Sequence, residues 1–189
     1  MQNGKIKVLS SKTVYTGRIF HMDKDVIEMD GRKITREIIH HPGSSLMIPV
    51  LDIGKKQIVL IEQYRYAAGG SIIEFPAGTR DKGESYKTCA ARELTEETGF
   101  KPGKVTEVTR FYLAPGTMTE VMAMFLCLKL EKKTMNLMDD EKIKPYITTL
   151  DKAVKMVFSG RIKDSKTITA LMMLKEIYSD NQLSRKFLK

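Results

Sequence analysis

Three glutamates lie close together in the segment Gly78–Phe100, which reads GTRDKGESYKTCAARELTEETGF and contains Glu93, Glu96 and Glu97. Residues three and four positions apart share one side of a helix, so in a helix these carboxylates would project from roughly one face. Like charges in this arrangement repel one another, and a hard divalent cation would remove the repulsion. Ligands that are all oxygen favour Mg²⁺ or Mn²⁺ over Zn²⁺. The spacing therefore predicts a magnesium or manganese site, and the alternative is a solvated acidic helix face.

The residues around these glutamates also predict a helix. After Gly83 the apolar residues change from alternation to helical spacing, and Ser85 is a plausible N-cap. Gly99 is a plausible residue for the C-terminal end, and Gly78 would let the chain turn sharply before the helix. Segments rich in Ile and Val and bounded by Gly predict strands before it, and further strands are predicted after it. These segments are residues 46–52, 57–65, 71–76, 105–113, 120–132 and 143–150.

The two ends of the chain complete the predicted fold. The first forty or so residues alternate between polar and apolar, with Asp30-Gly31 as a hairpin signal. Residues 151–158 and 165–178 carry apolar side chains at helical spacing. We predict the fold class α/β (α+β): a mixed β-sheet sandwiched between helices, with a small N-terminal antiparallel β-unit at residues 1–43 and a second domain at residues 44–189. Pro145 is poorly suited to a central strand, so the last strand should be an edge strand or bulged.

Length and composition exclude several classes of protein. The 189 residues are enough for one full-sized core, and a charged fraction of 29% is typical of globular chains rather than disordered or fibrous ones. No apolar run approaches the ~18 residues that a membrane helix needs, and the first residues lack the pattern of a signal peptide. Cys89 and Cys127 are too few for a disulfide framework. They are predicted to be buried free thiols, which favours a cytoplasmic location.

The net charge of +9 leaves two interpretations open. It could indicate a nucleic-acid partner or the attraction of an anionic, phosphorylated substrate. The basic residues are scattered along the chain and form no stripe interleaved with aromatic residues. This distribution argues against a nucleic-acid partner and favours a solvated basic surface.

The segment Gly78–Phe100 also matches every defined position of the Nudix box, and on these residues the chain resembles the Nudix hydrolases. Such enzymes use Mg²⁺ or Mn²⁺ to split the diphosphate of a nucleoside diphosphate that is linked to another group. A complete match of this length is far more specific than a lone GxGxxG motif. The matching residues are Gly78, Glu84, Arg92, Glu93, Leu94, Glu96, Glu97 and Gly99. The resemblance implies a Nudix fold and a Nudix hydrolase domain at residues 44–189.

The resemblance also implies a role for each residue of the box. Glu93, Glu96 and Glu97 would be metal ligands, with the backbone carbonyl of Ala77 as a further ligand. Arg92 and Glu84 would form an ion pair that holds the loop against the helix. Gly78 would be the structural glycine that begins the box.

Sequences that flank the box resemble the ADP-ribose pyrophosphatases and related nucleotide-sugar hydrolases. They are IEQYRYAAGGSIIEFPAG before the box and YLAPGTMTE after it, where Pro115 stands fifteen residues past the box. By this resemblance Arg65 would contact the phosphates, Arg36 would lie near the substrate and Glu120 near the terminal ribose. Arg65 could instead be a surface residue of a strand, and Glu120 a charge at a strand edge.

The catalytic base is harder to assign. In the enzymes that the chain resembles, the base often lies outside the box on a mobile acidic loop before the last strand. The corresponding residues here are Asp139, Asp140 and Glu141, although relatives usually have a more glutamate-rich loop. We favour Glu141, then Asp139, and Glu96 within the box if the loop does not supply the base. The alternative for the loop is a solvated turn.

The function expected from these resemblances is metal-dependent hydrolysis of ADP-ribose or a related nucleoside diphosphate sugar, with a nucleoside monophosphate and a sugar phosphate as products. Two alternatives stay open: hydrolysis of GDP-mannose or of an RNA 5′ end, and a non-catalytic sensor of ADP-ribose. Relatives form homodimers through the N-terminal β-unit, and the apolar residues of this unit are too many for so small a sheet to bury alone. A homodimer is therefore expected, without a membrane partner.

Overall fold

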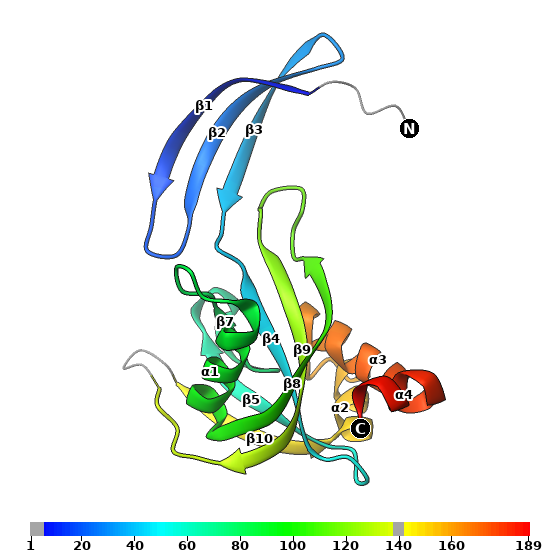
Figure 1. Ribbon diagram of the computed structural model, residues 1–189. Helices are drawn as coiled ribbons and strands as arrows, with labels where there is room; N and C mark the ends of the chain where they lie inside the picture. The colour runs from blue at the N-terminus through cyan, green and yellow to red at the C-terminus, as the bar shows by residue number, and fades with distance from the viewer. Residues whose placement is uncertain (1–5, 138–141) are drawn as a thin grey trace. The chain divides into compact units, whose positions relative to one another are not determined.

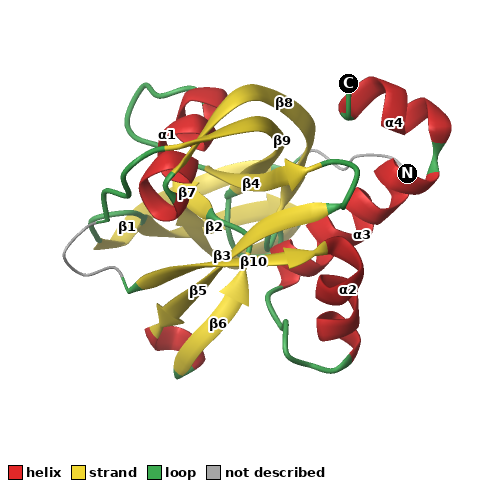
Figure 2. Cartoon of the chain, turned by 90° about the horizontal axis from the view of Figure 1, so that it is seen from below, coloured by secondary structure: helices red, strands yellow, loops and turns green. Residues whose placement is uncertain are grey.

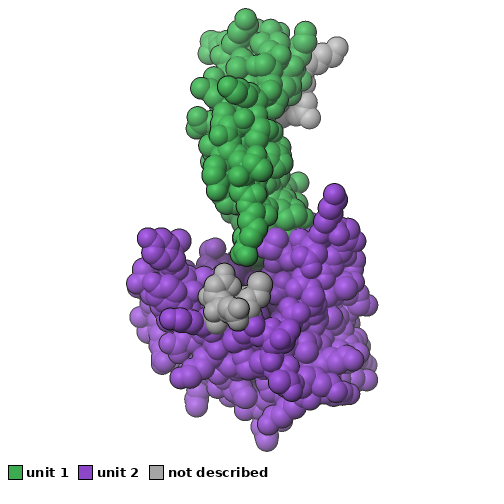
Figure 3. Space-filling model, turned by 90° about the vertical axis from the view of Figure 1, so that its left-hand side faces the viewer, with its two compact units in different colours: residues 1–43, 111–122 green, residues 44–110, 123–189 purple. Residues whose placement is uncertain are grey.

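The computed structural model describes residues 6–137 and 142–189, which form two compact units (Figure 3). Unit 1 comprises the chain up to Gly43 together with Phe111–Met122. Unit 2 comprises Ser44–Arg110 and Ala123–Lys189. Within the described residues, no helix is both long and apolar enough to span a membrane.

Unit 1 is built on a three-stranded antiparallel sheet in the order β1-β2-β3 (Figure 1). Its strands are β1 (Lys7–Thr16), β2 (His21–Met29) and β3 (Arg32–His40). Asp30 and Gly31 join β2 to β3 with positive φ values of 51° and 73°, as a tight hairpin requires. The predicted hairpin is confirmed. Strand β2 begins at His21, and its pairing with β3 runs without a bulge from His21↔His40 to Met29↔Arg32.

The second segment of unit 1 is attached to the end of β3 by backbone hydrogen bonds. The Ile39 N–H donates to the Thr117 carbonyl at 2.9 Å, and the Thr119 N–H donates to the Ile39 carbonyl at 2.9 Å. Residues 111–122 therefore belong with the N-terminal sheet although they lie far from it in sequence.

Unit 2 contains the larger sheet, whose strands follow the order β10-β5-β4-β9-β8, with β6 paired to β5 and β7 paired to β4. The strands are β4 (Ser44–Asp52), β5 (Gln57–Arg65), β6 (Gly70–Glu74), β7 (Ala77–Thr79), β8 (Phe100–Tyr112), β9 (Val121–Lys132) and β10 (Ile143–Thr149). A short 3₁₀ turn, η1 (Tyr66–Ala68), separates β5 from β6. Strand β10 lies at one end of this order and pairs with β5 without a register shift, so the strand that contains Pro145 is an edge strand, as predicted.

Helices cover both faces of this sheet (Figure 2). Helix α1 (Tyr86–Thr98) lies on one side, and α2 (Leu150–Phe158) and α3 (Ser165–Ser179) lie on the other. A cluster of fully or almost fully buried side chains joins α1 to β4 and β9: Met47, Ala90, Leu94, Ala123, Phe125 and Cys127. The predicted α+β class and the sheet between helices are confirmed. Cys89 and Cys127 are buried and free, as expected.

Two short elements were missed in the sequence. Strand β7 has only three residues, and helix α4 (Asn181–Phe187) follows α3 almost directly. Asp180 ends α3 and caps α4, because its Oδ1 accepts a hydrogen bond from the Leu183 N–H at 2.7 Å. Elements this short have too few residues for a periodic pattern to identify them.

Candidate metal centre on helix α1

Helix α1 is bounded by local signals at both ends. Ser85 is its N-cap, and the Ser85 Oγ accepts a hydrogen bond from the Thr88 N–H at 3.1 Å. Gly99 ends the helix in the left-handed conformation (φ 68°), and its N–H donates to the Thr95 carbonyl at 3.0 Å. Both predicted ends of the helix are confirmed. The bounds fix which residues face the sheet and which carry the glutamates.

The three glutamates of α1 differ in exposure. Glu97 is only 3% exposed, the side chain of Glu93 is 12% exposed, and that of Glu96 is 33% exposed. A carboxylate that leaves water loses hydration free energy, which must be regained from a positive charge or from hydrogen-bond donors. This face of α1 therefore favours a cation, and the side-chain atoms that could bind a metal there are all oxygen.

Glycine at position 78 allows strand β7 to approach the helix. The pairs Ser45↔Gly78 and Leu46↔Ala77 hold β7 against β4, and the Glu93 side chain lies directly over Gly78. A Cβ atom at position 78 would stand 2.0 Å from the Glu93 Cδ. Any side chain there would displace the Glu93 carboxylate, so Gly78 is required for the position of Glu93 as well as for the turn.

Arg92 is the counter-charge of the cluster. Its Nε and Nη2 donate to the two oxygens of Glu84 at 3.0 and 2.9 Å, which is a bidentate pair. Its Nη1 donates to the Glu93 Oε1 at 2.8 Å and to the Glu96 Oε2 at 3.1 Å. The hydrogen bond from Arg92 lowers the pKa of Glu84, and the same bond raises the pKa of Arg92. The expected pair of Glu84 and Arg92 is therefore present, and Arg92 also contacts two of the candidate metal ligands.

The contacts of Arg92 with Glu93 and Glu96 explain how these glutamates are arranged. The ligand atoms of Glu93, Glu96 and Glu97 do not form a compact group; among the described residues, only His21, Asp23 and His40 place three such atoms within 4.8 Å of one another. Instead, the guanidinium of Arg92 lies between Glu93 and Glu96 and offsets their repulsion.

Arg65, at the end of β5, is held by a buried carboxylate. Its Nε donates to the Glu74 Oε1 at 2.7 Å, and Glu74 is completely buried. Burial alone would lower the pKa of Arg65, but the hydrogen bond and charge of Glu74, together with the charges of Glu97 and Asp164, raise it. Arg65 is therefore held in place by Glu74, and the charge of Glu97 also contributes to raising its pKa.

Lys166 is a partner of this network that the sequence did not reveal. Its Nζ contacts the second oxygen of Glu74 and donates to the Asp164 Oδ1 at 2.8 Å. The sequence did contain a signal for Glu74, the buried partner of Lys166. Glu74 is a charged residue within the otherwise apolar stretch SIIEFP, and a charge in such a stretch is unusual.

The remaining predicted residues lie in unit 1 or outside the described residues. Arg36, on β3, is exposed, and its Nη1 donates to the Thr35 carbonyl at 3.3 Å. Glu120 is 8% exposed, and its Oε1 lies 3.6 Å from the His41 Nδ1. Pro115 lies in a turn where the Ala114 carbonyl accepts from the N–H groups of residues 117 and 118. Asp139, Asp140 and Glu141 lie outside the described residues.

Comparison with known proteins identifies the family. The model of the NUDIX domain matches residues 41–171, so the chain belongs to the Nudix family. Over 179 residues it is 34% identical to an ADP-ribose pyrophosphatase of Bacillus subtilis (strain 168), covering 92% of this chain and 95% of that protein. It is 34% identical to a methanol dehydrogenase activator of Bacillus methanolicus, covering 89% of this chain and 91% of that protein. The family and the relatives make this chain a hydrolase.

Two further comparisons agree with this family and fold. A GDP-mannose pyrophosphatase of Shigella flexneri serotype 5b (strain 8401) is 30% identical over 160 residues, which cover 79% of this chain and 83% of that protein. A crystal structure of an ADP compounds hydrolase superposes with a TM-score of 0.81 at 21% identity, over 93% of this chain and 95% of that one. At this identity the superposition shows that the fold is the same.

The pair of Glu84 and Arg92 predicts an acid-dependent loss of stability. The pKa of Glu84 is lower in the folded protein than in the unfolded chain, so the pair stabilises the fold above the unfolded pKa, and this contribution disappears as the pH falls through the folded pKa. Glu84→Gln should lower the free energy of unfolding by about 1–2 kcal/mol at neutral pH and much less at about pH 3. Denaturant unfolding at both pH values measures this difference.

Glu107→Gln is the matched control, because Glu107 also pairs with an arginine, Arg110, but both side chains are exposed. Solvent screens that pair, so the control should change the free energy of unfolding only slightly at either pH. Equal effects of the two substitutions would show that the Glu84 pair has no special role in holding the loop.

Proposed function

We propose that the chain hydrolyses the diphosphate bond of ADP-ribose or of a related nucleoside diphosphate sugar, with Mg²⁺ or Mn²⁺ as cofactor. The observation that carries the proposal is the cluster on one face of α1: Glu93, Glu96 and Glu97, balanced by Arg92. The relatives named as ADP-ribose pyrophosphatase and GDP-mannose pyrophosphatase support a nucleotide-sugar substrate. A cytoplasmic location belongs to the same proposal, because both cysteines are buried free thiols.

The donor set of the site fits a hard divalent cation. Glu93, Glu96, Glu97 and the carbonyl of Ala77 would hold it, since these oxygens lie on α1 and on the adjacent strand β7. When bound, such an ion neutralises charge on the diphosphate and orients the attacking water. Arg92 would give up its contacts with Glu93 and Glu96 and stay fixed by Glu84.

The cationic side chains of the chain would bind the diphosphate. Arg65 is kept charged and oriented by the buried Glu74, so its terminal amino groups can donate to phosphate oxygens. Arg36 and Glu120 are proposed as contacts to the substrate and its terminal ribose. In the reaction, the water oxygen forms a bond to one phosphorus and the bridging P–O bond breaks. The bond electrons stay on the leaving phosphate, and the water proton passes to a carboxylate base.

GDP-mannose is the second candidate substrate, favoured by the relatives that bear that name. The two candidates share the diphosphate chemistry of α1 and differ in the base and the sugar. A non-catalytic sensor is less well supported, because each defined position of the box retains its residue. Incubation with Mg²⁺ and a panel of ADP-ribose, GDP-mannose, UDP-glucose, NADH, diadenosine polyphosphates and capped RNA identifies the substrate directly.

Glu97→Gln should abolish most of the activity. The loss of one carboxylate ligand removes several kcal/mol of transition-state stabilisation, and each ~1.4 kcal/mol is a factor of ten, so kcat should fall on the order of 10³-fold. The fold should persist or become more stable without metal, because one buried negative charge is gone. Hydrolysis of ADP-ribose by both proteins is the measurement, with thermal unfolding in EDTA as the check on folding. Full activity in this variant, or wild-type activity that resists EDTA, contradicts the metal role; Glu107→Gln is the control.

The proposed base has its own test. Glu141→Gln should lower kcat by about 10²–10⁴-fold with little change in KM, because the substitution keeps size and binding contacts but cannot accept a proton. Asp139→Asn and Asp140→Asn should have smaller effects. Near-normal kcat in all three variants would move the base to Glu96.

We also propose that the chain forms a symmetric homodimer through the sheet of unit 1. Several apolar side chains of unit 1 are exposed in the single chain, among them Val8, Val14, Ile19 and Phe20. Exposed apolar residues gathered on one small sheet are typical of an interface. Relatives of this class are expected to complete each substrate site from both chains, which would give the basic and acidic residues of unit 1 a role.

Light scattering at micromolar concentration should give the mass of a dimer. Val14→Glu should shift the mass towards a monomer, because it places a charge in the proposed apolar interface. Lys12→Glu, on the same exposed strand, is the control for a change of charge and should leave the dimer intact. A monomeric wild-type protein would rule out this assembly.

A further inference from the structure

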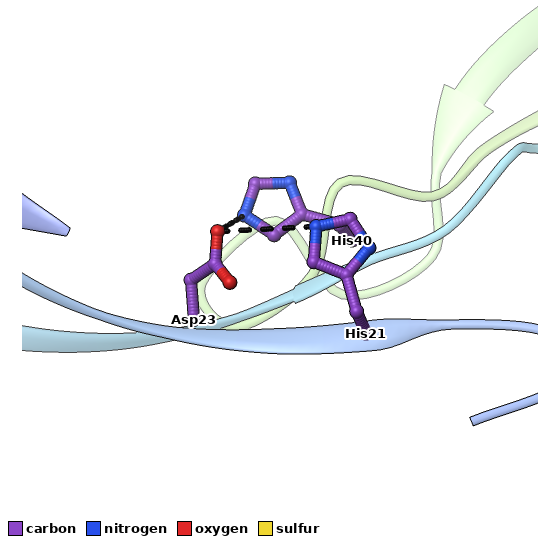
Figure 4. Close-up of side chains that lie close together, drawn as sticks. All are labelled: His21, Asp23 and His40. Atoms are coloured by element: carbon purple, nitrogen blue, oxygen red, sulfur yellow. Dashed lines mark ion pairs between the residues drawn. The ribbon is translucent and has the colours of Figure 1, made fainter. Parts of the chain in front are cut away.

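Two histidines and an aspartate share one face of unit 1, at the end of the β2–β3 ribbon (Figure 4). His21 and His40 are directly opposite each other in the antiparallel register. Asp23 follows His21 by two residues on β2, so its side chain points to the same face. These residues are far in sequence from the Nudix box and belong to no part of the proposed reaction.

The polar atoms of this cluster converge. The Oδ2 of Asp23 lies 3.3 Å from the Nε2 of His40 and 3.8 Å from the Nε2 of His21. The other oxygen, Oδ1, accepts a hydrogen bond from the Thr13 Oγ1 of β1 at 2.7 Å. Thr13 therefore fixes the carboxylate and leaves Oδ2 directed at the imidazoles. A hydrogen bond to the non-ligating oxygen is the usual support for a metal-binding carboxylate.

A second observation points to a missing ligand. The Nε2 of His40 is buried and has no hydrogen-bond partner among the described residues, because the 3.3 Å contact with Asp23 lacks hydrogen-bond geometry. Buried polar atoms without a partner are rare and need an explanation. The two imidazole rings are stacked, with centroids 4.6 Å apart and planes 6° apart. Two imidazolium cations would repel in that arrangement, whereas two neutral rings can share one cation.

We propose that His21, Asp23 and His40 form a zinc site that is separate from the Nudix box. Two imidazoles and one carboxylate are a donor set for Zn²⁺, in contrast to the oxygen-only glutamates of α1. Bonds of ~2.0–2.1 Å in a tetrahedron place ligand atoms roughly 3.3–3.5 Å apart. The distance between His40 and Asp23 already has this value, and that between His21 and Asp23 is slightly longer.

Small ring rotations complete the site. Parallel rings do not direct their lone pairs at one point, so both imidazoles must turn about their side-chain bonds when the ion binds. Their side chains are 46% and 36% exposed, which leaves room for this movement. His21 and His40 also line a surface hollow of about 420 Å³, with Arg18 among its other lining residues. The hollow can accommodate a water molecule or a small anion as the fourth ligand.

Equilibrium dialysis of the untagged protein against micromolar Zn²⁺, with Mg²⁺ in large excess, tests the proposal. We expect one zinc ion per chain in the wild type, and Co²⁺ in its place should give the intense visible absorption of tetrahedral coordination. His21→Ala and His40→Ala should each lose the ion, and Thr13→Val should weaken binding by about 10–100-fold. Zinc should also raise the Tm of the wild type and leave the Tm of the two histidine variants unchanged.

Two controls separate this site from other zinc ligands. His41→Ala changes the third histidine, which lines the same hollow but contacts Glu120 instead of Asp23, and it should bind zinc like the wild type. Glu97→Gln should also keep the ion, because the box is a different site. Should a histidine variant fail to fold, Asp23→Asn, which preserves size, takes its place. The proposal is overturned if the wild type binds no zinc, if Mg²⁺ displaces it, or if the His21 and His40 variants bind as the wild type does.

Discussion

Negative charge on one face of α1 is the constraint around which unit 2 is organised. Three glutamates share that face, and Glu97 is almost completely buried, so the helix needs positive charge close by. Arg92 supplies it to Glu93 and Glu96 from the same helix, and Glu84 keeps Arg92 in place with two hydrogen bonds. The loop before α1 is thereby attached to the middle of the helix. The counter-charge of Glu93 and Glu96 thus comes from the chain itself.

Close packing adds a second requirement to this electrostatic one. Glu93 lies over the backbone of Gly78, so β7 and α1 are in contact through a glutamate and a residue without a side chain. On an adjacent side of α1, the apolar residues Ala90 and Leu94 pack against the sheet. The helix therefore cannot rotate to relieve the repulsion among its carboxylates. The packing of Ala90 and Leu94 therefore helps to fix the orientation of the helix that carries the carboxylates.

Features that depend on neighbours in sequence could be predicted, whereas pairings between distant residues were missed. The caps of α1 and the hairpin at Asp30-Gly31 involve neighbours in sequence, so residue type alone indicated them. Glu74 and Lys166 are 92 positions apart, and nothing in either local sequence shows that they meet. The pairing of His21 with His40 was accessible in principle, because a two-residue turn at Asp30-Gly31 fixes the register of the whole hairpin. It was missed because the N-terminal β-unit was predicted as a whole, without assigned ends for its strands.

The buried Glu74 has a consequence for how this protein can diverge. Its fully buried carboxylate pairs with two cations, Arg65 from β5 and Lys166 from α3. Loss of both cations would leave the buried carboxylate of Glu74 without compensation, which costs several kcal/mol. Selection should therefore act against a substitution that unbalances these charges, whereas joint replacement by neutral residues would not leave a buried charge unpaired. Across homologous chains, the residues at positions 65, 74 and 166 should therefore change together.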